Sequence, residues 1–223
     1  MAPLLLAALG WIGLHLLVAG PLRPGLVDRL GEWRFRQMFA VASALLLLAL
    51  ILSYRAAPFV PIWSPPQWAY VWAHLCMVPA FVLLALSLTD SPTGVLAGSR
   101  AFEPRGVFRI TRHPMLWSFA IWAAVHVIGN GDTASLLFFG AFLLTALLGM
   151  PSIDAKAAAR DPERWARFTA RSSILPFGAI AAGRNRLVWR EIGWLPPVLG
   201  LLLWVAVLHF HRAVFGVAPV IFG

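Results

Sequence analysis

The chain has 223 residues, of which 60% are hydrophobic and only 12% are charged, and its mean hydropathy is +0.79. Soluble globular domains carry about 25% charged residues, so this composition excludes an ordinary soluble domain and indicates an integral membrane protein. The formal charge of +9 could suit a nucleic acid, but the positions of the basic residues indicate a membrane topology instead, and no nucleic-acid partner is expected. A single cysteine, Cys76, excludes an intrachain disulfide and a thiolate metal cluster.

Six apolar segments are long enough, or nearly so, to cross a bilayer core that needs about 20 helical residues. They are expected near residues 3–20, 37–55, 68–90, 113–130, 134–151 and 195–213. The first lacks a basic region before its apolar run, so it is predicted to be a retained span rather than a cleaved signal peptide. The chain is therefore predicted to be one all-α domain over residues 1–223, a polytopic transmembrane helical bundle of about six spans.

The basic residues predict how this bundle is oriented. All lysines and arginines except Arg55 and Arg212 lie in the connections after the first, third and fifth segments. Cytoplasmic loops are enriched in Lys and Arg, so these three connections are predicted to face the cytoplasm. Both termini are then expected on the outer, periplasmic side of an inner (cytoplasmic) membrane, with the lipid bilayer as a partner.

A helix is also predicted in the last basic connection. Asp161-Pro162-Glu163 is typical of a helix start, with a capping acid, a proline at the first position and a second acid facing the positive end of the dipole. Trp165 and Phe168 follow among arginines. The pattern predicts a cytoplasmic amphipathic helix between the fifth and sixth spans, which either lies on the membrane surface or is stabilised by neighbouring residues.

The stretch from Arg105 to Asp132 combines a basic run, an Arg-His-Pro step and an apolar helix that carries His126 near its end. Pro114 suits the first turn of a helix, where its missing N–H needs no partner. The turn Gly129-Asn130-Gly131-Asp132 is expected to end the helix. An imidazole inside a bilayer is costly and needs a partner, so His126 is a candidate site residue.

Other residue types offer little chemistry. The carboxylates fall in loops or at the ends of the predicted spans, which argues against a carboxylate proton relay and against a two-carboxylate hydrolase. No H-E-x-x-H pair, Gly-rich phosphate loop or G-x-S-x-G motif occurs. Histidine therefore remains as the candidate functional residue.

A buried cofactor such as haem would take its histidines from different helices. His113 and His126 are separated by roughly 20 Å of helical rise and cannot bind one metal atom. His126 could pair with His15 of the first span, at a depth that differs by roughly 10–15 Å, or with His74 of the third, which matches its depth better. Spacing leaves both pairs open. Each histidine could instead bond a backbone carbonyl without any cofactor.

Several short stretches, in their order and spacing, resemble a known family. They are G-W-I-G-L-H-L-L at Gly10–Leu17, R-H-P at 112–114 and W-A-A-V-H at Trp122–His126, with weaker support from Asp161–Phe177. These stretches resemble the NnrU membrane proteins, which are associated with nitrite and nitric oxide reduction. The chain also resembles the plant and cyanobacterial 15-cis-zeta-carotene isomerases, which are membrane proteins that carry haem b.

The resemblance implies a cofactor site. It implies one haem b between the first and fourth spans, with His15 and His126 as ligands of the iron. The isomerases carry a cysteine three residues before the second histidine, proposed as a switchable ligand. This chain has Ala123 there, so a mechanism that needs a thiolate ligand is not expected.

A cluster of basic residues is expected beside this cofactor. Arg109, Arg112 and His113 are predicted to lie near the cytoplasmic mouth of the bundle. There they could bind the propionates of the haem or an anionic headgroup. They could instead serve only to enforce topology.

Three functions are compatible with these stretches. The first is a haem protein with a redox or assembly role in nitrite or nitric oxide reduction, and the second is a haem-dependent cis-trans isomerase of a polyene. The substrate would then be a nitrogen oxide or a small apolar molecule. Third, the R-H-P step and the Pro-Phe tail also resemble membrane methyltransferases that bind S-adenosylmethionine at the cytoplasmic face. Their downstream acidic pair is missing here, because Ala155 and Lys156 follow Asp154.

Overall fold

The computed structural model describes residues 1–88 and 103–219. In this part of the chain the structure is helical, and its only β-type pairing is an isolated bridge between Pro61 and Asp132. The elements are α1 (Ala2–Ile12), the π-helical segment η1 (Gly13–Val18), α2 (Arg23–Leu30), α3 (Glu32–Ala56), α4 (Gln67–Ser87), the 3-10 turn η2 (Gly106–Arg109), α5 (Pro114–Asn130), α6 (Thr133–Arg160), α7 (Pro162–Ala170), α8 (Gly178–Ala181), α9 (Trp189–Ile192) and α10 (Leu195–Phe215). The all-α membrane bundle predicted from the sequence is confirmed.

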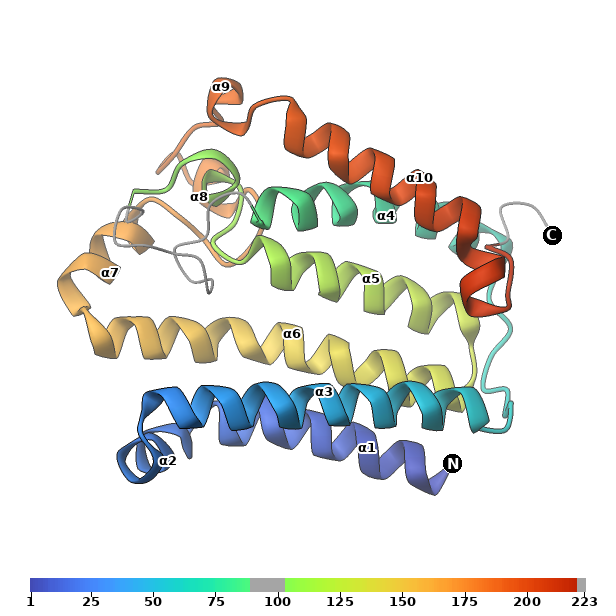
Figure 1. Ribbon diagram of the computed structural model, residues 1–223. Helices are drawn as coiled ribbons and strands as arrows, with labels where there is room; N and C mark the ends of the chain where they lie inside the picture. Colours follow the sequence, from blue (N-terminus) through green and yellow to red (C-terminus); the bar gives the residue numbers. More distant parts are fainter. Residues whose placement is uncertain (89–102, 220–223) are drawn as a thin grey trace.

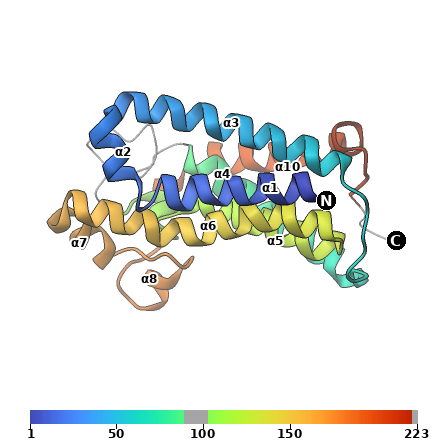
Figure 2. The same cartoon turned by 90° about the horizontal axis from the view of Figure 1, so that it is seen from below.

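The long helices lie side by side in a row (Figures 1 and 2). α10 packs against α4, α4 against α5, and α5 against α6, while α1 packs against both α6 and α3. Because α6 contacts both η1 and α5, it connects the two helical segments that carry the candidate histidines His15 and His126.

The helices alternate in direction, so their connections separate into two groups. α1 begins and α10 ends at the same end of the bundle, and α2, α7, α8 and α9 lie at the opposite end (Figure 1). The described basic connections therefore gather at one end, as the sequence predicts, although Arg100 lies outside the described residues. That this end faces the cytoplasm stays a prediction.

Four helices, α3, α4, α6 and α10, are long and apolar enough to cross a membrane individually. α1 and η1 qualify only together with α2, as a pair bent by 77°. α5 has 17 residues, slightly fewer than a full crossing usually requires. Helices thus occur at all six expected places, while six as the number of crossings stays a prediction.

α6 is longer than the sequence pattern predicted. The expected span ended at 151, but the helix continues through Pro151 to Arg160. A proline removes one backbone hydrogen bond, and the stretch 155–159 that follows contains four alanines, the best helix formers. The extension carries Asp154 and Lys156 to the arginine-rich end of the bundle, where both make contacts described below.

α7 begins where it was predicted, because the Asp161 carboxylate accepts a hydrogen bond of 3.1 Å from the backbone N–H of Arg164. Its apolar side chains, Trp165 and Phe168, are buried in a cluster with Val107 and Phe108 around η2. This apolar face is covered by the protein itself. Of the two alternatives for the helix, stabilisation by neighbouring residues is the one found.

The end of α5 is also tied to a distant connection. Gly131 adopts a left-handed conformation with φ of 68°, which glycine tolerates without steric cost. Its carbonyl oxygen accepts hydrogen bonds from the backbone N–H groups of Ile62 and Trp63, and a Cβ at this position would collide with the Trp63 carbonyl. The predicted turn after the helix is therefore confirmed, and it also fixes the connection between α3 and α4.

Candidate histidine site and the arginine-rich end of the bundle

His15 and His126 have the same local setting on different helices. Nδ1 of His15 lies 3.0 Å from the carbonyl oxygen of Trp11, and Nδ1 of His126 lies 2.7 Å from that of Trp122. A carbonyl can only accept, so each Nδ1 donates and each Nε2 is left as the basic nitrogen. Neither Nε2 has a hydrogen-bond partner among the residues that the structure describes.

The two tryptophans were not singled out from the sequence. Besides accepting from the imidazole, each contacts its ring: the centroids of Trp11 and His15 are 4.0 Å apart, and those of Trp122 and His126 are 5.4 Å apart. The signal was the spacing itself, since Trp-x-x-x-His occurs in both stretches and places the two side chains one helical turn apart.

His15 lies in η1, one of the less common helical forms. The six residues Gly13–Val18 are π-helical, and π-helical turns inside α-helices are frequently found at functional sites. Nothing in the sequence pattern predicted this segment. It gives His15 a backbone environment that the ordinary helix around His126 does not have.

Aromatic rings of α6 lie between the two histidine motifs. The ring centroid of Phe142 is 4.9 Å from that of Trp11 and 5.4 Å from that of Trp122. Phe139 stacks on His126 with centroids 4.7 Å apart. The two imidazoles are thus connected through a chain of ring contacts and do not touch each other.

The donor chemistry of this arrangement fits a haem iron. A ligating histidine usually donates its other ring N–H to a carbonyl or carboxylate, and both imidazoles are held in this way with Nε2 available. The described residues contain no group of three or more His, Cys, Asp or Glu side chains that could hold a metal ion, whereas a haem iron needs only the axial ligands that two histidines provide.

A haem would also need space between His15 and His126. The rings of Trp11, Phe142 and Trp122 fill it, so these rings would have to turn aside for both histidines to bind one iron. The indole N–H of Trp11 is buried and has no hydrogen-bond partner among the described residues. An unpaired buried donor is costly. The Trp11 ring is therefore held in its present position less firmly than it would be if its N–H made a hydrogen bond.

Two other histidines lie on helices near His126. His74 is on α4, which packs against α5, and makes no hydrogen bond to a described residue. His211 on α10 interacts electrostatically with His126, and its own Nδ1 donates to the Val217 carbonyl at 2.8 Å. Neither has the tryptophan setting that His15 and His126 share, which favours His15 over His74 as the partner of His126.

Arg109 was predicted to lie at the mouth with its charge available, but its guanidinium is already bound. Nε lies 2.6 Å from Oε2 of Glu191 and Nη2 lies 2.8 Å from Oε1, and Nη1 donates to the Asn185 side chain at 2.6 Å. Such bidentate pairs are the strongest type of ion pair. Arg109 thereby ties η2 to the segment that precedes α10.

Arg112 and His113 share one carboxylate. Nη2 of Arg112 lies 2.6 Å from Oδ2 of Asp154, and Nε2 of His113 lies 2.7 Å from Oδ1. The side chain of His113 is only 1% exposed, and those of Arg112 and Asp154 are 12% and 14% exposed. Both basic groups therefore point at an internal partner, and whether they also bind a cofactor or headgroup stays a prediction.

The same region holds the loop after α7 in place. The backbone N–H of Arg112 donates to the Ser173 carbonyl at 3.0 Å. The Thr111 hydroxyl and the Trp117 indole N–H both donate to the Ile174 carbonyl, at 2.6 and 2.8 Å. The Arg-His-Pro step is thus the point where the start of α5, the end of α6 and the loop 172–177 are joined.

The pairing of Glu191 predicts a pH-dependent stability. Hydrogen bonds from Arg109, and then one from the backbone N–H of Gly106, lower the pKa of Glu191 from 4.5 to about 2. The unfolded chain, with the ordinary pKa, takes up a proton first as the pH falls. The stabilisation is therefore complete above about pH 4.5 and is lost as the pH falls towards 2.

A thermal-unfolding comparison of detergent-solubilised wild type and Glu191→Gln checks this expectation. The variant is expected to melt at a lower temperature at pH 7, and the difference should shrink between pH 4.5 and pH 2. The effect is modest because the Glu191 side chain is 28% exposed. A difference between the two proteins that stays constant over this pH range would contradict the assignment.

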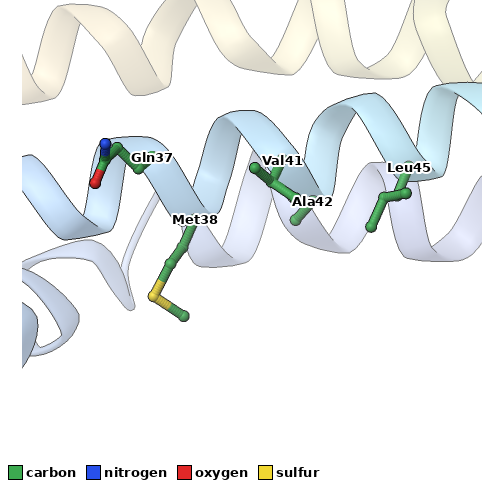
Figure 3. A pocket seen from close by; sticks show the side chains of 5 residues that line it. All are labelled: Gln37, Met38, Val41, Ala42 and Leu45. Atoms are coloured by element: carbon green, nitrogen blue, oxygen red, sulfur yellow. The ribbon is translucent and has the colours of Figure 1, made fainter.

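Two hollows on the described residues are a shallow groove and a small cavity. An apolar groove of about 360 Å³ runs along one face of α3 and is lined by Gln37, Met38, Val41, Ala42 and Leu45 (Figure 3). A cavity of about 60 Å³ lies between η2 and α9. Sites for ligands of drug size usually have about 300–1,000 Å³, so the cavity at the arginine-rich end gives no support to a site for S-adenosylmethionine within the described residues.

Helices long enough to span a bilayer, together with two tryptophan-backed histidines, define this chain as a polytopic helical membrane protein with a candidate cofactor site. A family model described as "NnrU protein" matches residues 3–219. The chain therefore belongs to the NnrU family.

Curated relatives agree with this assignment. The chain is 26% identical to the protein named "15-cis-zeta-carotene isomerase, chloroplastic" of Arabidopsis thaliana over 202 residues, which cover 84% of this chain and 53% of that protein. It is 30% identical to the protein of the same name from Zea mays over 82 residues, covering 37% of this chain and 22% of the relative. The chain thus spans about half the length of the Arabidopsis protein and a smaller share of the Zea mays protein. No solved structure matches.

Proposed function

We propose that this NnrU-family protein binds one haem b through His15 and His126 and has a redox or assembly role in nitrite or nitric oxide reduction. The observation that carries the proposal is the setting shared by the two histidines. Each donates Nδ1–H to the carbonyl of a tryptophan one turn earlier and keeps Nε2 free of other described partners. This is the form in which imidazole binds iron.

The residues of the chain determine what such a centre can do. A haem held by the imidazoles of His15 and His126 would supply one-electron transfer, and with both ligands provided by the protein it would offer no site for a substrate. The rings of Trp11, Phe142 and Trp122 make the region between the histidines apolar, and an apolar surrounding would tune the potential of a haem bound there once the rings had turned aside. The arrangement therefore favours electron transfer or delivery of a redox centre over direct binding of a nitrogen oxide to the iron.

Cis-trans isomerisation of a polyene is the second candidate, because both curated relatives are named for that activity. Ala123 argues against it. This residue occupies the position where the resemblance places a cysteine, and it is fully buried in the apolar core that joins α1, α5 and α6. A thiolate for ligand exchange is therefore missing at this position. Conversion of added 15-cis-zeta-carotene, followed by chromatography, separates the two functions.

The experiment that tests the proposal is a visible absorption spectrum of the purified protein, produced in cells with ample haem, in the oxidised and reduced states. A low-spin b-type spectrum with about one haem per chain is expected, since both axial positions would be filled by histidine. A colourless protein would overturn the haem proposal. Binding of S-adenosylmethionine by such a protein would then support the methyltransferase alternative.

A further inference from the structure

A group of cations lies where η1 ends and α2 begins, with Arg23 and Lys156 half-buried and Arg160 exposed. The ammonium of Lys156, on the extension of α6, donates a hydrogen bond of 2.9 Å to the carbonyl of Ala19. The charges of Arg23 and Arg160 both act on Lys156. Arg23, Lys156 and Arg160 thus bring three positive charges of two different helices to one place, and we call them the α1-end cation cluster.

Carboxylates do not balance this cluster within the described residues. Glu32 accepts from Arg23 at 2.6 and 2.7 Å, but it also accepts from Arg36 at 2.7 Å. One carboxylate is therefore shared by two arginines, and Lys156 and Arg160 have no acidic partner among the described residues. Like charges repel one another, and most strongly where they are partly buried, as Arg23 and Lys156 are, so an external anion would stabilise the cluster.

The chain turns sharply beside the cluster, between η1 and α2. The path bends by 77° between η1 and α2, and a Cβ at Gly20 would collide with the Leu16 carbonyl, so this sharp turn requires glycine. The turn interrupts the helix and exposes the Ala19 carbonyl, to which Lys156 donates. An ammonium group has three donors, and only one of those of Lys156 is used in the described structure.

A series of aromatic contacts, through Phe35 and Phe39, connects the cluster with His15. The guanidinium of Arg23 lies 5.5 Å from the ring centroid of Phe35. Phe35 stacks with Phe39 at 6.1 Å, and Phe39 meets His15 edge-on at 5.3 Å. An amphiphile whose apolar body lies along these aromatic residues would therefore have its anionic end at the cations.

We propose that the α1-end cation cluster binds the anionic end of a membrane amphiphile whose apolar body lies beside η1 and α3. A carboxylate or phosphate has the required charge and acceptor oxygens. An anionic phospholipid and the haem itself are the two sources of such a group. Of these two alternatives, only the haem rests on the proposed function. Arg109 and Arg112 are bound to Glu191 and Asp154, whereas Lys156 and Arg160 keep unused donors.

Two double variants of the full-length, detergent-solubilised protein test this site. Lys156→Gln with Arg160→Gln removes two charges of the cluster, and Arg186→Gln with Arg190→Gln removes two exposed charges from the connection before α10. Binding of phosphatidylglycerol and phosphatidylcholine is measured by titration in native mass spectrometry. Haem and haem dimethyl ester, which lacks free carboxylates, are titrated by absorbance.

The cluster double variant is expected to bind the relevant anion more weakly by about fivefold for each charge removed, with the control double variant close to wild type. If the cluster double variant loses the preference for phosphatidylglycerol over phosphatidylcholine, the site binds a phospholipid. If it loses the preference for haem over haem dimethyl ester, the site binds the haem. Lys156→Arg should retain binding, which shows that charge rather than folding is responsible.

Two results would overturn the proposal. If both double variants weakened anion binding equally, binding would depend only on the total positive charge of this end of the bundle. Unchanged binding of all ligands in the cluster variant would mean that no anion binds there. If the wild type takes up no haem, the haem proposal fails, and the phosphatidylglycerol titration still decides the site.

Discussion

Alanine in place of His15 or His126 is expected to abolish the low-spin spectrum of the haem. Each substitution removes one axial nitrogen, so the iron becomes high-spin with one protein ligand, or the haem is lost. We expect haem content to fall by at least several-fold in the double variant. The measurement is the absorption spectrum in both redox states, together with haem bound per chain after purification in the same detergent.

His74→Ala and His209→Ala are the matched controls, because they remove imidazoles of α4 and α10 that lack the tryptophan setting. Both should keep the wild-type spectrum. Loss of the spectrum in His74→Ala, with an unchanged spectrum in His15→Ala, would mean that the second ligand comes from α4 and not from η1. An unchanged spectrum in both proposed ligand variants would rule out the pair.

The reason for expecting a large effect lies in how the histidines are held. Each imidazole is bonded to a backbone carbonyl of its own helix, so its position does not depend on the cofactor. The helices should therefore form without haem, and the variants should remain folded. Unchanged thermal unfolding of haem-free wild type and of the haem-free variants would establish that the spectral loss is a ligand effect.

The helices were predictable because their signals are local. Pro114 at the first position of α5, Gly131 after its end and Asp161 at the cap of α7 all act within a few residues. Each was read correctly from the sequence. The end of the fifth span was expected at 151, whereas α6 continues through Pro151 to Arg160. A proline is compatible with a helix end as well as with a helix interior, and only the tertiary contacts of the following turns decide between them.

The candidate site was predictable in part. The resemblance to the 15-cis-zeta-carotene isomerases pointed to His15 and His126, and the repeated Trp-x-x-x-His spacing could have added Trp11 and Trp122. The π-helical form of η1 has no sequence signal that we recognise. The aromatic contacts of Phe142 with both tryptophans depend on how three helices are packed, which hydrophobic periodicity in one segment does not specify.

Ion pairs between distant segments were the least predictable feature. Asp154 had been considered only as the remnant of an acidic pair, yet it accepts from both Arg112 and His113. This contact requires the end of α6 to be in register with the start of α5. A sequence reveals the charges but not the register, so Arg109, Arg112 and His113 were expected to be available to an external anion.

Replacing Asp154 with alanine is expected to destabilise the protein strongly. The change leaves His113 and Arg112 almost fully buried without their carboxylate, and breaking a buried ion pair costs about 3–5 kcal/mol because the remaining charge is uncompensated. For a chain of this size each kcal/mol corresponds to about 2–4 °C in the melting temperature. A decrease of roughly 10 °C is therefore expected in thermal unfolding of the detergent-solubilised protein.

Glu163→Ala is the matched control, since Glu163 is an exposed carboxylate in the first turn of α7. It removes the same charge from the same end of the bundle, and its melting temperature should change by no more than about 2 °C, as for most surface substitutions. A similar small change in Asp154→Ala would contradict the role of the buried pair.

A double-mutant cycle separates the ion pair from the other effects of losing Asp154. If the two side chains stabilise each other, Arg112→Met with Asp154→Leu should cost less than the sum of the single substitutions, because the double variant leaves no unpaired charge between them. The hydrogen bonds from Thr111 and Trp117 to Ile174 do not involve Asp154. They should therefore keep the loop 172–177 in place even in the double variant, so hydrogen exchange there should change less than at the start of α5.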